Sequence, residues 1–300
     1  IFFNGPREAW VTQGGKTERV DVSFSGAQAM TDCGLRLLAS TGVSLTDNAH
    51  FGHGYLKDGS RVHLALPAVG GPYVTIDRPV SNPPSLPELS ANGTLSQDMG
   101  SFLTQAFALG RVIIVSSNDL EARFELISAI VGSEMGPSRI VFVEPGGRFP
   151  RNQGHVVLSG GPGANLTSMV DEALQMRPDR LILADARGPE TLGALTAMGG
   201  AVNGGIIGVD AESPDDAIIR LARQVNLSAS AKASSIESMI RDRADVLVQV
   251  LAYADGRRRV TQIMDLDGDV QEVFSGFDAF SGTGYIPRWY ENARSLGHEL

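Results

Sequence analysis

The segment from Val112 to Val131 has the polarity pattern of a place where a phosphate group could be held. It reads as a short apolar strand, a turn, and then an amphipathic helix. Phosphate-binding loops use this frame because the backbone N–H groups at a helix N-terminus attract anions. Such a loop also needs glycine for close backbone approach, a lysine for the phosphates and a hydroxyl after the lysine for the metal ion. The turn from Ser117 to Phe124 has no glycine, no lysine and no such hydroxyl.

The residues that occupy this turn have a different chemistry. Asn118, with Glu121 three positions later, has the spacing of a capping box, and Asp119 also falls in the expected first turn of the helix. A side-chain cap contributes about 1 kcal/mol, and each carboxylate near the helix N-terminus adds about 0.3–1 kcal/mol. These groups satisfy the helix terminus from within the chain and repel a polyanion. We therefore expect a closed site, blocked by acidic side chains, that does not bind a nucleotide tightly.

Two other segments have a superficial likeness to phosphate loops. Lys16 stands in GGKT, but Trp10 occupies the place of the motif's first glycine and the flanks read as a β-hairpin. GGPGANLT, at 160–167, is rich in glycine and precedes a predicted helix, but it has no lysine. The remaining lysines are Lys57 and Lys232, and neither lies in such a frame. We expect a hairpin at the first segment and a surface turn at the second.

The other candidate reactive groups favour structural roles. His50 and His53 form an H-x-x-H pair, but no acidic or cysteine ligand lies near them in the sequence, so a solvated loop is expected. Cys33 lies among apolar residues of a predicted helix and is expected to be a small buried residue. Asp215 and Asp216 fall in a helix's first turn, where acids are common. No metal site and no cofactor site are predicted.

Composition excludes several classes of protein. The net charge of −9 disfavours duplex DNA and anionic membranes as the main partner. The longest apolar runs, such as 112–115, are much shorter than the roughly 18 residues that a membrane span needs. The single cysteine excludes an internal disulfide. A cytoplasmic protein is the simplest expectation, and the start at Ile1 instead of a methionine suggests a shortened chain.

The pattern along the chain predicts two domains joined by a linker. Residues 1–82 read as short strands around one helix that ends at Gly42, and the proline-containing segment 83–96 reads as a linker. Residues 97–300 alternate between strands and helices, which predicts an α/β fold with a mostly parallel sheet. Strands are expected at 112–116, 139–143, 155–158, 180–184 and 206–209, helices at 119–135, 167–176, 189–198 and 214–226, and closing strands at 245–253, 258–265 and 269–274.

Several segments, in this order and spacing, resemble the CpaF/TadA branch of the bacterial secretion ATPases over nearly the whole chain. They are FNGP (3–6), LKDGSRV (56–62), ALQMRPDRLIL (173–183), ARGPETLGALTAM (186–198), SPDDAIIRL (213–221), DGRRRVTQI (255–263) and the ending P-x-W-Y-E-x-A-x-x-L-G. The resemblance implies a RecA-like C-terminal domain and a smaller α+β N-terminal domain, which is PAS-like in the family. The turn at Arg257–Arg259 matches a family turn and is expected to be surface or a subunit contact.

The chain departs from the family where the family's nucleotide chemistry lies. The family loop G-G-T-G-S-G-K-T-T aligns with SNDLEARFE, from Ser117 to Glu125. The positions that correspond to the family's nucleotide site are Arg123 for the lysine, Phe124 for the Mg²⁺-binding hydroxyl, Glu144 and Arg148 for the acidic box, Ala184 and Asp185 for the Walker B Gly-Glu, and Val202 and Asp210 for two histidines. Arg187 resembles a family position near the active site and is expected to form a structural ion pair.

The resemblance and these departures together imply a pseudo-ATPase. Family members form hexamers at an inner-membrane platform, so we expect a structural or regulatory subunit of a Tad-type pilus or secretion machine. An active secretion-ATPase paralogue, the platform protein or further copies of the chain are the implied partners. Two alternatives stay open at this point: a divergent ATPase that uses Arg123, Glu144 and Asp185 in altered roles, and a sensor that binds another small ligand.

Overall fold

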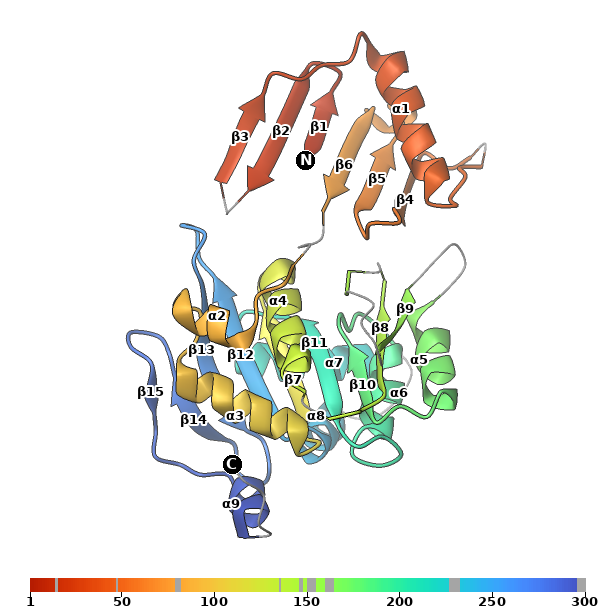
Figure 1. Cartoon of the computed structure of the whole chain (residues 1–300). Coiled ribbons are helices and arrows are strands. Elements are labelled where there is room, and N and C mark those ends of the chain that lie inside the picture. The colour runs from red at the N-terminus through yellow and green to blue at the C-terminus, as the bar shows by residue number, and fades with distance from the viewer. Residues whose placement is uncertain are drawn as a thin grey trace.

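The computed structural model describes residues 1–13, 16–46, 48–78, 82–134, 136–145, 148–149, 155–159, 165–226 and 233–295. The chain folds into two separate β-sheets, which Figure 1 shows one above the other, with the chain's start in the upper sheet. The division agrees with the change in sequence pattern between the first 80 residues and the rest.

The N-terminal sheet has six antiparallel strands in the order β3-β2-β1-β6-β5-β4. Its elements are β1 (Phe2–Gly5), β2 (Glu8–Gln13), β3 (Lys16–Val20), α1 (Ala27–Ser40), β4 (Phe51–Tyr55), β5 (Arg61–Ala65), the short 3-10 turn η1 (Pro67–Val69) and β6 (Tyr73–Asp77). Helix α1 covers one face of the sheet, where Met30 and Leu38 pack on Leu64 and Val74. As predicted, α1 ends at a glycine: Gly42 has a φ of 82°, which favours glycine.

The expectation of irregular structure over 83–96 is wrong for its central part, which forms helix α2 (Leu86–Ala91). Ser85 and Glu88 form a capping box, and the proline in the first turn needs no N–H partner there. The helix is anchored because Leu86 and Leu89 are buried in the core of the C-terminal part. Here the prolines mark a helix start instead of a break.

The C-terminal sheet has nine strands in the order β15-β14-β13-β12-β7-β11-β10-β8-β9, and the strands from β12 to β9 are parallel. This confirms the predicted α/β fold with a mostly parallel sheet. Its elements are α3 (Gln97–Ala108), β7 (Val112–Ser117), α4 (Leu120–Gly132), β8 (Ile140–Glu144), β9 (His155–Ser159), α5 (Leu166–Gln175), β10 (Arg180–Leu183), α6 (Glu190–Ala197), β11 (Gly205–Asp210), α7 (Pro214–Asn226), α8 (Ala233–Arg243), β12 (Val246–Ala252), β13 (Arg258–Asp265), β14 (Gln271–Ser275), β15 (Ser281–Gly282) and α9 (Arg288–Ser295).

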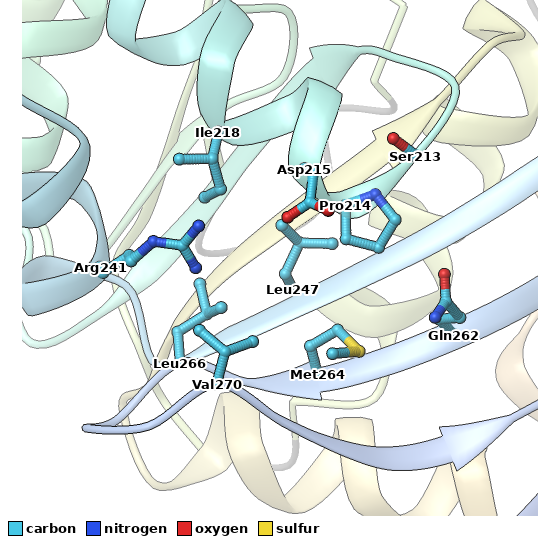
Figure 2. A pocket seen from close by; sticks show the side chains of 10 residues that line it. All are labelled: Ser213, Pro214, Asp215, Ile218, Arg241, Leu247, Gln262, Met264, Leu266 and Val270. Atoms are coloured by element: carbon cyan, nitrogen blue, oxygen red, sulfur yellow. The ribbon is translucent and has the colours of Figure 1, made fainter. Parts of the chain in front are cut away.

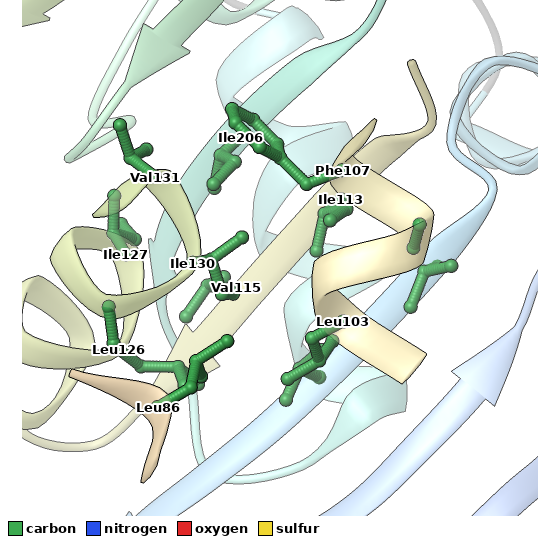
Figure 3. Close-up of a cluster of buried hydrophobic side chains, with 14 of the residues drawn as sticks. Leu86, Leu103, Phe107, Ile113, Val115, Leu126, Ile127, Ile130, Val131 and Ile206 are labelled. Atoms are coloured by element: carbon green, nitrogen blue, oxygen red, sulfur yellow. The ribbon is translucent and has the colours of Figure 1, made fainter. Parts of the chain in front are cut away.

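The first four residues of strand β7, 112–115, are apolar, because helices cover both faces of the sheet. Ile113 and Val115 belong to the cluster that includes α3 and α4 (Figure 3), whereas Val112 and Ile114 belong to the cluster on the opposite face. A strand that is buried on both sides reads as a continuous apolar run. No helix in the described ranges is long and apolar enough to cross a membrane.

Candidate functional site

The candidate site lies where the parallel strands end. Strand β7 ends at Ser117, β8 at Glu144 and β11 at Asp210, and Asp185 follows two residues after the end of β10. The carboxyl ends of parallel strands lie at one edge of a sheet, which is where open α/β sheets bind ligands. The alignment of Asp210 with Ser117 in neighbouring strands places β11 and β7 level at this edge. The fold therefore gathers most of the positions that the sequence singles out.

A buried ion pair fills the space between the start of α4 and these strand ends. The Nη2 atom of Arg123 donates to Oδ1 of Asp185 at 2.7 Å, and its Nη1 donates to the carbonyl of Ser117 at 3.4 Å. The Arg123 side chain is only 2% exposed. Gly208 of β11 leaves room for it, because a Cβ at that position would lie 3.1 Å from Cδ of Arg123. The arginine thus points inward, toward the sheet.

Asp185 is held by a second cation, as expected for Arg187. Its Oδ2 accepts from Nε of Arg187 at 2.5 Å, although the Arg187 side chain is 59% exposed. Burial lowers the pKa of the Arg123 guanidinium below its ordinary value, and the attraction of Asp185 opposes this shift. Burial also acts to lower the pKa of Arg187, but the ion pair with Asp185 outweighs it and the pKa is raised. One carboxylate is therefore compensated by two guanidinium groups.

The start of α4 is capped from within the chain, but by a different residue than predicted. Asp119, in extended conformation, accepts from the backbone N–H of Ala122 at 2.7 Å. Asn118 exchanges two hydrogen bonds with the backbone of Ala252, at 3.2 Å to its carbonyl and 2.9 Å from its N–H. The prediction that Asn118 caps the helix is wrong because its amide matches the free backbone groups at the end of β12.

Glu121 does not complete a capping box either. Because Asp119 is the N-cap, Glu121 is only the second residue of the helix, and the backbone N–H of Asp119 donates to Oγ of Ser117 at 3.0 Å. Glu121 forms an ion pair with Arg148, and the guanidinium of Arg148 lies 5.2 Å from the centre of the Phe124 ring. Arg123 therefore pairs with Asp185 at the strand ends, whereas Arg148 contacts α4 through Glu121 and Phe124.

Phe124 stands where a metal-binding hydroxyl would be needed, and it belongs to an aromatic cluster. Its ring stacks on Phe149 at 5.0 Å, and Phe149 in turn contacts Phe142 of β8 at 4.5 Å. Phe124 is buried and packs in the same core as α3 and β7. A phenyl ring offers no oxygen to a hard cation such as Mg²⁺.

The remaining positions that the alignment points to are less close to this centre. Glu144 is fully buried at the end of β8. Asp210 is largely exposed and pairs with Arg220 of α7 at 3.4 Å. Val202 is buried in the hydrophobic cluster around α6 and α7. Val202 therefore offers no polar group, whereas the Asp210 carboxylate acts electrostatically on Arg123 and Arg187.

A cleft of about 890 Å³ opens beside the start of α4, between the N-terminal hairpin and the C-terminal part. Asp119, Glu121 and Glu125 stand on the α4 side, and Arg258, the first residue of β13, pairs with Asp119 at 3.3 Å and with Glu125 at 2.6 Å. Arg258 was expected at the surface or in a subunit contact, but it binds within the chain. The cleft is lined by Thr12, Pro84, Asn92, Gly93, Thr94, Asp119, Glu121, Glu125, Ala252, Tyr253, Gly256, Arg257, Arg258, Arg259, Phe277 and Asp278.

A smaller hollow of about 200 Å³ lies near the start of α7, next to α8 and β13 (Figure 2). Ser213 caps α7 by accepting from the N–H of Asp216 at 3.2 Å, and Pro214 opens the helix, which agrees with the predicted range of 214–226. Asp216 also pairs with Arg220 at 2.9 Å. Asp215 and Asp216 are therefore first-turn residues of a helix, as the sequence indicated.

The other sequence candidates give mixed outcomes. Lys16 begins strand β3 opposite Gln13, as the hairpin prediction requires. The prediction that His53 lies in a loop is wrong, because it is part of strand β4. Its two neighbours in the strand, Gly52 and Gly54, allow close packing on the α1 side. Cys33 is half-buried, not fully buried. The glycine turn over 160–164 and its predicted conformation lie outside the described residues.

Sequence reasoning missed Gly208 and the partner of Asn118. A glycine inside the apolar strand IIGV signals close approach of another group, which is here the Arg123 side chain and the carbonyl of Ala184. Nothing in the sequence points from Asn118 to Ala252, which lies 134 residues away. That contact depends on the order of strands in the sheet.

The chain has relatives among proteins of bacterial transfer systems. No protein-family model matches it. A Mycobacterium tuberculosis protein named for conjugal transfer is 25% identical over 292 residues, which cover 91% of this chain and 83% of the relative. The type IV secretion system protein PtlH of Bordetella pertussis is 29% identical over 181 residues, which cover 56% of this chain and 53% of PtlH.

The fold is that of secretion ATPases. The Legionella pneumophila ATPase DotB superimposes with a TM-score of 0.61 at 14% identity, covering 89% of this chain and 77% of DotB. The VirB11 ATPase of a Brucella suis type IV secretion system and the pilus retraction motor PilT also share the fold. The chain is therefore a RecA-like α/β protein with a smaller N-terminal domain, and its relatives and structural neighbours are of the VirB11, DotB and PilT type.

Proposed function

We propose that this chain is a catalytically inactive homologue of the secretion ATPases, a pseudo-ATPase that serves as a structural or regulatory subunit of a secretion or pilus machine. The sequence relatives support a place in such a machine. The sequence likeness to the CpaF/TadA branch favours a Tad-type pilus. On this proposal the subunit works at the cytoplasmic face of the inner membrane, through an active ATPase paralogue or a platform protein.

The observation that carries the proposal is the buried pair of Arg123 and Asp185. On this proposal, a guanidinium at the position of the family's lysine could reach a phosphate at the start of α4 only by leaving Asp185. Separating one partner from a buried ion pair costs about 3–5 kcal/mol. Each 1.4 kcal/mol is a factor of ten in affinity, so this cost weakens nucleotide binding by about two to four powers of ten.

Two further features act in the same direction. Phe124 takes the place of a metal-binding hydroxyl and is fixed by stacking on Phe149. Asp119 and Glu121 line the cleft beside the start of α4, and Asp119 already accepts from the N–H of Ala122, one of the helix-terminus donors that a phosphate would need. The three obstacles come from different side chains, so a single substitution does not remove them together.

Calorimetric titration with MgATP, alongside a phosphate-release assay, tests the proposal. No heat of binding and no phosphate release are expected up to about 1 mM nucleotide, which is the weak end of ordinary affinities. A suitable positive control is an active secretion ATPase in the same buffer. The matched variants are Arg123→Ala, which opens the buried space, and Arg187→Ala, which leaves the Arg123–Asp185 pair in place.

Low-micromolar MgATP binding that Arg123→Ala abolishes and Arg187→Ala preserves would refute the pseudo-ATPase. It would favour a divergent ATPase that uses Arg123 on the phosphates. The role as a subunit has a separate test, because it does not require nucleotide. The purified chain is expected to co-elute with an active secretion ATPase from the same cell on a sizing column, and failure to do so with that ATPase and with its platform protein contradicts the proposed role.

A further inference from the structure

The N-terminal sheet has one covered face and one open face. Helix α1 and the segment after it pack on one side of strand β4, where a Cβ at Gly52 would lie 2.6 Å from the Leu45 side chain. Successive side chains in a strand point to opposite faces, so Phe51, His53 and Tyr55 lie on the other side. On that side Phe51 is 65% exposed and His53 is exposed, whereas Tyr55 is half-buried.

Two histidines face each other across strands on this open face. His53 of β4 is directly opposite His63 of β5 in an antiparallel pair. The backbone bonds from Leu66 to His50, at 2.7 Å, and from Leu56 to Ser60, at 2.8 Å, close the hairpin on either side of this pair. Counting inward from both ends, hydrogen-bonded residue pairs alternate with non-hydrogen-bonded ones.

This alternation makes His53 and His63 a non-hydrogen-bonded pair. In such pairs the Cα atoms are only about 4.5 Å apart and the side chains are at their closest. Directly opposite residues also share a face of the sheet, with Cβ atoms about 4.5–5.5 Å apart. The two imidazoles therefore stand side by side over the same patch of the sheet.

We propose that His53 and His63 together bind a divalent transition-metal ion. Imidazole nitrogens lie about 2.0–2.1 Å from Zn²⁺, so two of them at a tetrahedral ion are roughly 3.3 Å apart. Two imidazoles that start from neighbouring Cβ atoms span this distance without backbone movement. Nitrogen ligands select Cu²⁺, Ni²⁺ or Zn²⁺ over the oxygen-seeking Mg²⁺ and Ca²⁺.

The surroundings leave the rest of the coordination sphere open. Asp77, on the neighbouring strand β6, is paired with Arg61 at 3.7 Å. The described ranges contain no group of three or more candidate metal ligands, so the remaining positions fall to water or to a ligand from a second molecule.

His50 is not part of this site, although it forms the H-x-x-H pattern with His53. It precedes strand β4, and its carbonyl is engaged with the N–H of Leu66. The partner of His53 comes from the next strand, ten residues further along the chain. This is why the spacing in the sequence points to the wrong histidine pair.

Titration of the whole chain with NiCl₂ by calorimetry tests the proposal, with ZnCl₂ as a second probe. One ion per chain is expected for the natural sequence, with a rise in the melting temperature of the chain because the ion binds only the folded hairpin. Loss of an outer-shell group already costs about 10–100-fold in metal affinity. His53→Asn and His63→Asn are therefore each expected to weaken binding at least that much.

The matched controls are His50→Asn and His155→Asn, which should bind as the natural chain does. His53 is exposed, so His53→Asn is expected to fold normally even where His63→Asn does not, and NMR supplies a test without any substitution. Substoichiometric Ni²⁺ should broaden the ring signals of His53 and His63 and leave those of His155 sharp. The proposal is overturned if Ni²⁺ fails to bind, if His53→Asn retains the affinity, or if His50→Asn loses as much.

Discussion

The substitution Arg123→Met removes the guanidinium from the buried pair and keeps an unbranched apolar stem in the same space. If the pair is a structural part of the C-terminal domain, this substitution must destabilise that domain. Removal of one partner from a buried ion pair costs about 3–5 kcal/mol because the other charge stays buried. Asp185 keeps its bond to Arg187, so the cost should lie near the low end, at about 3 kcal/mol.

The matched substitution is Arg187→Met, which removes the other arginine from the same carboxylate. The Arg187 side chain is 59% exposed, and exposed ion pairs contribute only about 0–1 kcal/mol. The two substitutions therefore differ in their expected cost by at least a factor of three, although both break an ion pair to Asp185. The double variant Arg123→Met with Asp185→Leu should be less destabilised than Asp185→Leu alone, because the latter strands Arg123 in the interior.

Urea unfolding followed by tryptophan fluorescence measures these free energies. The chain has 2 tryptophans, so a Trp10→Phe background leaves Trp289, which is 4% exposed in the C-terminal core, as the only reporter. The shift in the midpoint, multiplied by the slope of the transition, gives the change in the free energy of unfolding. Equal costs for Arg123→Met and Arg187→Met, or a cost below about 1 kcal/mol for Arg123→Met, would show that the pair is not structural.

Three further outcomes are expected. Gly208→Ala should lower the free energy of unfolding by about 2 kcal/mol or more, because the added Cβ would lie 2.0 Å from the carbonyl of Ala184; the same urea assay measures it, and a neutral result contradicts the packing described. Asp119→Ala should cost about 1 kcal/mol as a lost helix cap, and an unchanged unfolding midpoint would show that Asp119 does not cap α4. The pKa of His63 should lie below 6.5 because of burial and then Arg61; since the folded-state pKa is depressed, its contribution to stability is present above pH 6.5 and is lost as the pH falls through the folded-state value. An NMR titration measures it, and Arg61→Ala should raise it.

The order of layers in the C-terminal domain could be predicted because its strands are buried on both faces. Runs such as that of β7 have no polar alternation, and helices of regular length separate them, which is the pattern of a parallel sheet. The ends of α7 and β13 also match the prediction, since Pro214 and Ser213 mark the helix start in the sequence itself. Strong local signals of this kind leave little freedom.

A helix start capped from within the chain could be expected from the sequence, but the residues that cap and cover it could not. The spacing of Asn118 and Glu121 favours a capping box, and both side chains instead bind residues that are distant in the sequence. Local patterns compete with tertiary partners, and the partners cannot be read from spacing. The sequence predicts that acidic side chains block the site, whereas the side chain that lies buried between α4 and the strand ends is the cation Arg123.

The histidine pair of the N-terminal sheet shows the same limit from the other side. The register of β4 against β5 decides which histidine faces His53, and a shift by one residue would turn the side chains to the opposite face. The sequence contains both histidines but not the register. Only the closed hairpin fixes it.

The two hydrogen bonds between Asn118 and Ala252 have a consequence for how this protein can change over time. A side chain here continues the backbone ladder between β7 and β12 beyond the last paired residues. The segment that follows β7 is therefore bonded to the β12–β13 hairpin, which lies more than a hundred residues later in the chain. Arg258 of that hairpin forms an ion pair with Asp119 of the segment. Replacement of this segment by a glycine-rich phosphate-binding loop would remove the partners of the Ala252 backbone and of Arg258 at the same time. We therefore expect the two segments to be conserved, or to change, together in evolution.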